Sequence, residues 1–253
     1  MTLKRKDSDS SVAHISGQGQ GKGDSAQKSL DELVAGSLAF LRTLAREHDP
    51  ARTAVAFTGG KDSSVVLDLW RRALREERGG RAGDAPLLAL SLDTGLKFPE
   101  VTRLRDEMAA SFGARLVIAR PAPGCVVGPG DGREACCRAR KIEPLLASVR
   151  GLGLTLLLTG LRHDEHAARA GLGPLEPRTA PDHLRGHPIL AWSEMDVWAY
   201  IMQARLPYCS LYDEGYRSLG CAPCTHVADG GERSGRDADK EARMAELRAL
   251  GYF

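Results

Sequence analysis

The sequence lacks a long apolar run, a secretory signal pattern and a strong net charge. No apolar stretch approaches the length of a membrane-spanning helix. We therefore expect a cytoplasmic protein without a membrane partner. The formal net charge of +2 is too small to argue for a nucleic-acid partner, which would need a local basic patch, but it does not exclude one.

The apolar residues that are present suffice for one sizeable core. The chain has 253 residues, 42% of them hydrophobic, which fits one large α/β domain or one domain with appendages. Residues 1–28 are rich in Ser, Gly, Gln and charged side chains, which predicts a disordered tail. We expect the folded domain to span residues 29–236 and a C-terminal helix or tail to span 237–253. The oligomeric state stays open, a homo-oligomer included.

The stretch from Ala54 to Leu67, AVAFTGGKDSSVVL, predicts a buried strand, a Gly-Gly turn and a helix. Glycines let the backbone approach a ligand closely, and the helix that follows points its unpaired N–H groups into the turn. Lys61, Ser63 and Ser64 add side-chain donors suited to phosphate oxygens. The spacing matches neither the Walker-type loop nor the GxGxxG pattern. The plainer alternative is an ordinary strand–turn–helix connection.

Three further apolar segments predict the rest of a sheet. They are Leu87–Leu92, Arg115–Ala119 and Leu154–Thr159, with helical segments between them. This alternation predicts an α/β fold with a doubly wound, Rossmann-like parallel sheet and helices on both faces. Ligands bind such sheets at the carboxyl ends of the strands, where the glycine turn, Asp93 and the segment 160–162 all lie.

Two pairs of cysteines are candidate metal ligands. Cys136 and Cys137 are adjacent and precede a basic run, whereas Cys221 and Cys224 lie far downstream in a loop rich in Gly and Pro. In a reducing compartment, cysteines serve as metal ligands or reactive thiols more often than as disulfides. Four thiolates suit a [4Fe–4S] cluster or a tetrahedral zinc ion. We favour the cluster, because neighbouring side chains diverge and span a larger centre more easily. Zinc and unligated thiols are the alternatives.

Several long motifs in the sequence resemble motifs of one known protein family. The loop TGGKDS is close to the SGGxDS loop of the adenine nucleotide α-hydrolase (PP-loop) superfamily, with Thr58 in place of the first serine. Segment 136–145, CCRARKIEPL, and segment 212–225, YDEGYRSLGCAPCT, are similar to the two cluster segments of adenylyl-sulfate reductases. Segments 92–100, 159–169 and 187–201 are similar to the wider family, which includes the small subunit of bacterial ATP sulfurylase. The chain therefore resembles the phosphoadenosine phosphosulfate (PAPS) and adenylyl-sulfate reductase family.

The resemblance implies an adenine nucleotide as ligand and assigns roles to individual residues. It implies that the nucleotide is bound by Thr58, Gly59, Gly60, Lys61, Ser63, Ser64, Asp93, Gly160 and Arg162, with Lys61, Asp62 and Arg162 in catalysis. An oxyanion would be held by Arg169, Arg233 and Arg236, and the cluster by Cys136, Cys137, Cys221 and Cys224. Asp62 could also bind Mg²⁺ together with phosphate oxygens. The alternatives are a turn-stabilising role for Asp93 and a solvated surface role for Arg233 and Arg236.

Two departures from the reductases bear on the activity. The reductases have a degenerate phosphate loop without the lysine, whereas Lys61 and both glycines are intact here, as in the members that split ATP. The reductases also attack sulfur with a cysteine in a C-terminal tail, and this sequence has no cysteine after Cys224. The usual thiol route therefore has no evident agent.

The main expectation is an ATP-dependent adenylyl-transfer enzyme of sulfur metabolism. It would release pyrophosphate and activate sulfate or another acceptor for sulfur transfer, with a [4Fe–4S] cluster and Mg²⁺. The first alternative is an adenylyl-sulfate or PAPS reductase that releases sulfite with a thiol from a thioredoxin-like or sulfur-donor protein, or from Cys125. The second is a nucleotide- and cluster-binding subunit that works only in a complex, such as ATP sulfurylase with its GTPase subunit.

Overall fold

Strand β1 (Thr53–Ala56) lies inside the sheet and leads into the predicted glycine turn. The computed structural model describes residues 28–77 and 86–252, so the predicted tail lies outside the described residues except for Lys28. The sheet has six strands in the order β3-β2-β1-β4-β6-β5. The others are β2 (Leu88–Leu92), β3 (Arg115–Ala119), β4 (Leu156–Leu158), β5 (Leu175–Thr179) and β6 (Asp182–Gly186). Strands β1, β2, β3, β4 and β6 run parallel, which confirms the α/β prediction.

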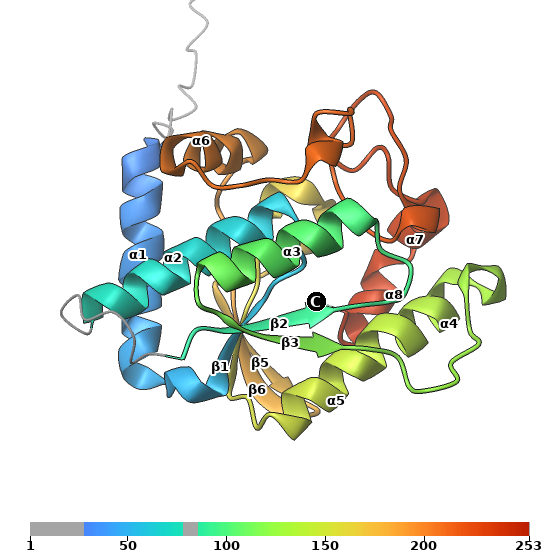
Figure 1. Cartoon of the computed structure of the whole chain (residues 1–253), viewed down its shortest axis with the longest axis horizontal. Coiled ribbons are helices and arrows are strands. Elements are labelled where there is room, and N and C mark those ends of the chain that lie inside the picture. Colours follow the sequence, from blue (N-terminus) through green and yellow to red (C-terminus); the bar gives the residue numbers. More distant parts are fainter. Residues whose placement is uncertain (1–27, 78–85, 253) are drawn as a thin grey trace, which may run out of the picture.

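Helices cover both faces of this sheet (Figure 1). Helices α1 (Leu30–Glu47), α2 (Lys61–Glu77), α3 (Pro99–Ser111) and α6 (Glu194–Ala204) share one apolar core with the sheet. Helix α5 (Glu143–Gly151) packs on the other face, against β1, β2 and β4. Side chains of a strand alternate between its faces, so Val55 joins the first core and Ala54 the second. Ala56, Leu92 and Leu157, near the carboxyl ends of β1, β2 and β4, line a cavity on the α5 face.

The edge of the sheet differs from the prediction. Strands β5 and β6 form an antiparallel pair, so the sheet is mostly rather than wholly parallel. Their sequences, LEPRT and DHLRG, are polar and short and contain no apolar run, which is why the apolar pattern did not reveal them. Pro177 in β5 fits an edge strand, since proline cannot donate to a second neighbour.

The C-terminal part also departs from a single helix. It forms α7 (Ala238–Ala242) and α8 (Met244–Ala249), which meet at Arg243. Helix α8 places Met244 and Leu247 in a small core with Ile142. This packing holds Tyr252, two residues beyond Leu250, beside the open end of the sheet. Among the described helices, none is both long enough and apolar enough to cross a membrane.

Candidate active site

The phosphate loop predicted between β1 and α2 is held by its own backbone and by Tyr212. Gly59 has φ +80°, and a Cβ there would lie 2.6 Å from the carbonyl oxygen of Val101. Ser63 Oγ accepts a hydrogen bond from the Thr58 amide at 3.2 Å, and Tyr212 accepts one from the Lys61 amide at 3.1 Å. The loop is thus a tight turn that only glycine fits at its first position.

A cavity of about 220 Å³ opens at this loop. Its apolar floor consists of residues from β1, β2, β4 and α5, namely Ala56, Leu90, Leu92, Leu145 and Leu157. Its polar wall carries the phosphate loop and many cationic side chains, namely Lys61, Lys97, Lys141, Arg169, Arg185, Arg233 and Arg236. An apolar floor beside a cationic wall suits a ligand with an aromatic base and an anionic group.

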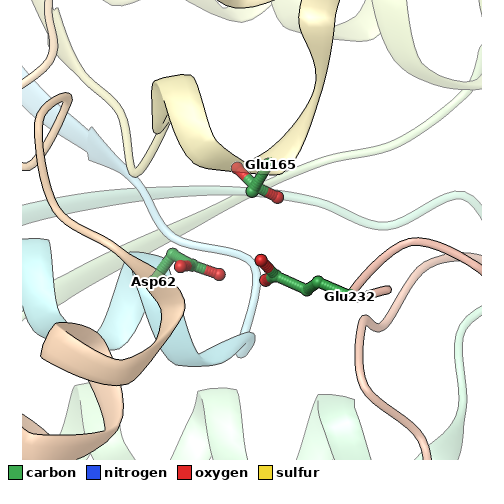
Figure 2. A group of neighbouring side chains, drawn as sticks. All are labelled: Asp62, Glu165 and Glu232. Atoms are coloured by element: carbon green, nitrogen blue, oxygen red, sulfur yellow. The ribbon is translucent and has the colours of Figure 1, made fainter. Parts of the chain in front are cut away.

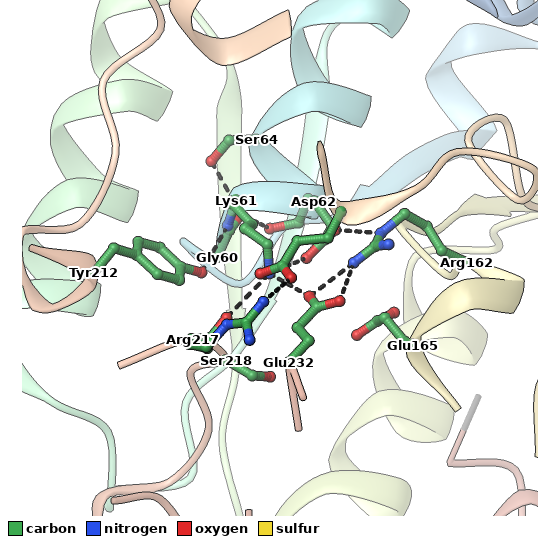
Figure 3. Close-up of polar contacts among 12 residues, drawn as sticks. Gly60, Lys61, Asp62, Ser64, Arg162, Glu165, Tyr212, Arg217, Ser218 and Glu232 are labelled. Atoms are coloured by element: carbon green, nitrogen blue, oxygen red, sulfur yellow. Dashed lines mark hydrogen bonds and ion pairs between the residues drawn. The ribbon is translucent and has the colours of Figure 1, made fainter. Parts of the chain in front are cut away.

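Lys61 and Arg162 sit in a buried ion-pair network at the loop (Figure 3). Arg162 Nε donates to Asp62 Oδ1 at 2.7 Å, and its Nη2 donates to both carboxylate oxygens of Glu232. Lys61 Nζ is ion-paired with Glu232 as well. Burial alone would disfavour the ammonium, but Asp62, Tyr212 and Glu232 outweigh it and raise the pKa of Lys61 above its ordinary value. Lys61 is therefore a fixed positive charge at neutral pH.

Three carboxylates from distant segments converge here. Asp62, Glu165 and Glu232 each place an oxygen within 4.8 Å of the others (Figure 2). Each is also neutralised by a cation, since Glu165 is ion-paired with Arg169 and Arg233. Burial would raise the pKa of Asp62, but Lys61 and Arg162 hold it below its ordinary value, so the carboxylate stays ionised. The trio has the ligand type that Mg²⁺ prefers.

The two predicted cysteine pairs meet beside the cavity. The Cys136 thiol interacts with those of Cys137, Cys221 and Cys224, and burial together with these neighbours raises its pKa. Helix α4 (Arg133–Cys137) carries the first pair, and a π-helical turn (Arg138–Ile142) follows it. The second pair flanks a short 3₁₀ turn that is bridged to Lys97. Distant sequence segments thus supply four sulfurs to one place.

Buried cations surround these sulfurs. Lys97, Lys141 and Lys240 interact with the thiol of Cys221 or Cys137, and the ion pairs found among the described residues join none of the three to a carboxylate. Burial raises the pKa of Cys221, but Lys141, Thr94 and Lys97 outweigh it and lower the pKa to about 7. Burial and the charge on Lys141 lower the pKa of Lys97 to about 8. The site has excess positive charge, which an anionic group would balance.

Most of the residues predicted as site residues line the cavity. Those that do are Thr58, Gly60, Lys61, Asp62, Ser63, Gly160, Arg169, Arg233 and Arg236. The structure contradicts a solvated surface role for these two residues, because the Arg233 side chain is only 10% exposed and Arg236 donates to Ser218 at 3.0 Å. Ser64 lies behind the loop, where its hydroxyl donates to the Gly60 carbonyl oxygen at 3.1 Å.

Asp93 and Arg162 make other contacts than the predicted ones with a ligand. Asp93 faces a second cavity and accepts from the Gly95 amide at 3.0 Å, which fits the turn-stabilising alternative. Arg162 does not line the main cavity and serves instead to hold Asp62 and Glu232. Sequence reasoning assigned no role to several lining or network residues, namely Lys97, Lys141, Glu165, Tyr212, Glu232 and Tyr252. Lys97, Lys141, Glu165 and Tyr212 stand inside the family motifs, which was the available signal, and Glu232 directly precedes the predicted Arg233.

Gly160 sets the distance between β4 and the phosphate loop, and we expect Gly160→Ala to weaken nucleotide binding. A Cβ at this position would lie 2.9 Å from the backbone carbonyl carbon of Asp62, so the start of α2 must shift. We expect a Kd for an adenine nucleotide that is about tenfold to hundredfold higher and a loss of about 1–3 kcal/mol in stability. Calorimetry and thermal unfolding would measure both. Gly36→Ala is the control, because nothing lies within 4 Å of a Cβ there.

Comparison with known proteins identifies the family. The sequence profile of the phosphoadenosine phosphosulfate reductase domain matches residues 52–227. An adenosine 5'-phosphosulfate reductase from Allochromatium vinosum is 33% identical over 221 residues, which cover 82% of this chain and 81% of that protein. The chain belongs to the phosphoadenosine phosphosulfate reductase family. A phosphoadenosine 5'-phosphosulfate reductase from Gloeobacter violaceus is 32% identical, with 78% of this chain and 83% of that protein covered.

Solved structures confirm the fold of this PAPS reductase family member. The phosphoadenylyl-sulfate reductase from Candida auris, in a phosphate complex, matches with a TM-score of 0.60 at 22% identity, covering 81% of this chain and all of that chain. Yeast FAD synthetase in complex with FAD matches with a TM-score of 0.65 at 18% identity, covering 81% and 71% of the two chains. At these sequence identities the structural similarity supports the fold alone and not the activity.

Proposed function

We propose that this PAPS reductase family member reduces adenylyl sulfate, or its 3'-phosphorylated form, to sulfite. The observation that carries the proposal is that the phosphate loop lines a cationic cavity and the four cysteines lie next to it, since Cys221 interacts with Lys97 and Lys141 of the cavity wall. The relatives named as adenosine 5'-phosphosulfate reductases support the substrate class. This gives the reductase alternative precedence over ATP-dependent adenylyl transfer, which the comparisons do not support.

The reaction needs two thiols and no other reductant. One thiolate attacks the sulfur of the sulfate group, the bond from that sulfur to the oxygen on the α-phosphate breaks, and AMP leaves with that oxygen. The S-sulfonated thiol then reacts with the second thiol, which releases sulfite and forms a disulfide. The thiol pair would come from a thioredoxin-like protein or another dithiol. In this scheme the cavity's arginines and lysines hold the sulfate and the departing phosphate, where fixed cations stabilise developing charge.

A [4Fe–4S] cluster fits the four cysteines better than zinc does. In the described part of the chain, no three of these sulfurs lie within 4.8 Å of one another. A tetrahedral zinc with bonds of about 2.3 Å would bring them to about 3.8 Å apart. Cys136, Cys137, Cys221 and Cys224 would hold the cluster, and its negative charge would balance the three neighbouring lysines. When bound, the cluster would place a large fixed charge beside the sulfate end of the cavity.

A second candidate function is cleavage of ATP between its α and β phosphates. The specific observation is Lys61 at the loop together with the three carboxylates, which could share a Mg²⁺ ion with phosphate oxygens. In this case the protein would work with an acceptor or a partner subunit such as a GTPase. The two candidates use the same nucleotide cavity but differ in the bond that breaks.

Paired assays on one anaerobic preparation separate the candidates. We expect sulfite and AMP in equal amounts from adenylyl sulfate and reduced thioredoxin, at a rate that no addition of ATP increases. In parallel, ATP with Mg²⁺ and sulfate is expected to yield no pyrophosphate. Pyrophosphate release from ATP together with no sulfite from adenylyl sulfate would reject the reductase and establish the second candidate.

A further inference from the structure

The carboxylate of Glu232 lies between the two cations at the phosphate loop (Figure 3). Its side chain is only 7% exposed. Arg162 Nη2 donates to its two oxygens at 2.7 and 2.5 Å, and Lys61 Nζ is ion-paired with the same group. An arginine and an ammonium that converge on a pair of anionic oxygens also form the contacts of a bound phosphate or sulfate. Glu232 thus occupies the place between Lys61 and Arg162 where an anion can bind, which we call the anion seat.

The charges in this seat are already balanced. Lys61 and Arg162 contribute two positive charges, and Asp62 and Glu232 contribute two negative ones at close range, while Glu194 lies 4.0 Å from Lys61 and Asp164 lies 3.3 Å from Arg162. A ligand anion that entered without displacing a carboxylate would find no net positive charge there. Asp62 belongs to the first turn of α2, which fixes its backbone, so its short side chain can move only by rotation. Glu232 has no such restraint, so it is the carboxylate that can be exchanged.

The segment that carries Glu232 is anchored at its base and free of helix and strand at its tip. The His226 amide donates to the Gly235 carbonyl at 2.9 Å, and Thr225 is bridged to Arg236. The tip contains Gly230, with φ +117°, and the exposed Gly231. Apart from the contacts of Glu232 and Arg233, a hydrogen bond from the Arg217 side chain to the Gly230 carbonyl oxygen holds the tip. The Arg217 side chain is 44% exposed. Arg233 is held by the Glu241 carboxylate at 2.7 and 2.8 Å, so the Glu232 side chain and the two glycines can move while Arg233 and the base stay in place.

We propose that Glu232 is a selectivity residue: its carboxylate fills the anion seat of the free protein, and a bound nucleotide displaces it. The identity of the ligand rests on the proposed function, but the exchange itself rests on the contacts above. An anion that contacts only Lys61 and Arg162 replaces the Glu232 carboxylate with no net gain in binding free energy. A nucleotide gains additional contacts with the apolar floor and Arg236, so it alone opens the seat.

Binding to Glu232→Gln tests the exchange. The neutral amide keeps the shape of the side chain but weakens its hold on Lys61 and Arg162, so a larger fraction of the protein is open to the ligand. We expect Kd values for adenylyl sulfate and for Mg·ATP, measured by calorimetry, that are about tenfold lower than for the wild type. Asp164→Asn is the matched control, because Asp164 also contacts Arg162, at 3.3 Å, but is 54% exposed. Its Kd should stay within twofold of the wild type.

Hydrogen exchange on the wild type gives a second, variant-free measurement. Ligands usually slow exchange near their site, but here we expect faster exchange at residues 230–232 when adenylyl sulfate binds, because the Glu232 carboxylate leaves its contacts. Equal or weaker binding by Glu232→Gln, or slower exchange at the tip, would overturn the proposal. Tighter binding of Mg·ATP alone would keep the exchange and reject the reductase. Failure of both proteins to bind either nucleotide would overturn the exchange, since a freed seat should accept one.

Discussion

Replacing Cys136 with serine is expected to remove the iron and the visible absorption from the anaerobically purified protein. The four sulfurs come from α4 and from the 3₁₀ turn after Cys221, so the loss of one ligand leaves a centre held by three. We expect iron to fall from about four atoms per chain to below one. The melting temperature should fall as well, because the bound centre contributes to folding and the neighbouring lysines lose the charge that balances them.

Cys209→Ser is the matched control for this variant. Cys209 is buried like Cys136, but it packs in a separate apolar cluster with Val101 and Leu104, away from the quartet. It should keep its iron and colour. A Cys136→Ser protein that stays coloured, or a wild type that carries one colourless zinc ion and no iron, would contradict the cluster. Adenylyl-sulfate reduction should be lost in Cys136→Ser and retained in Cys209→Ser.

The parts of the site that follow from local sequence were predicted well. The glycine turn after β1 and the carboxyl ends of β2 and β4 come from apolar runs and their breaks, and these are properties of a few neighbouring residues. The cysteine quartet was found through its chemistry, since few arrangements use two such pairs. The structure brings the two pairs near one another, as that interpretation required.

The parts that failed depend on contacts between distant segments. Glu232 and Lys61 are 171 residues apart, and nothing in the loop around Glu232 predicts which cation it meets. Arg162 was predicted to contact the ligand because arginine suits oxyanions; in the structure two carboxylates occupy its donors, so a ligand contact would require the displacement of Glu232. The β5–β6 hairpin has polar residues on an edge, so its pairing leaves no periodic apolar pattern. Such features become visible only when the chain is folded.

Lys61→Ala is expected to lower kcat/KM for the nucleotide substrate about 100- to 1,000-fold, the typical cost of removing one stabilising donor from an active site. Lys61 Nζ is the cation of the phosphate loop and its side chain is 1% exposed, so no solvent molecule compensates for it fully. Lys61→Arg should recover part of the activity, because the charge is kept. Ser64→Ala should change it less than threefold, since the Ser64 hydroxyl faces the Gly60 carbonyl and not the cavity. Unchanged turnover in Lys61→Ala would reject the role of the loop in either candidate reaction.

The double variant Lys61→Ala/Glu232→Gln separates the loss of a cation from the gain of an unbalanced anion. Without Lys61, the carboxylates of Glu232 and Asp62 face a ligand anion with only Arg162 between them. If Glu232 fills the anion seat, removing its charge as well should restore part of the nucleotide affinity, and the two substitutions will not be additive. If Glu232 instead assists the bound nucleotide, the double variant should bind more weakly than Lys61→Ala alone. Calorimetry with adenylyl sulfate on the four proteins of this cycle distinguishes the two cases, because the change in binding free energy that Glu232→Gln causes in the Lys61→Ala background has opposite signs in them.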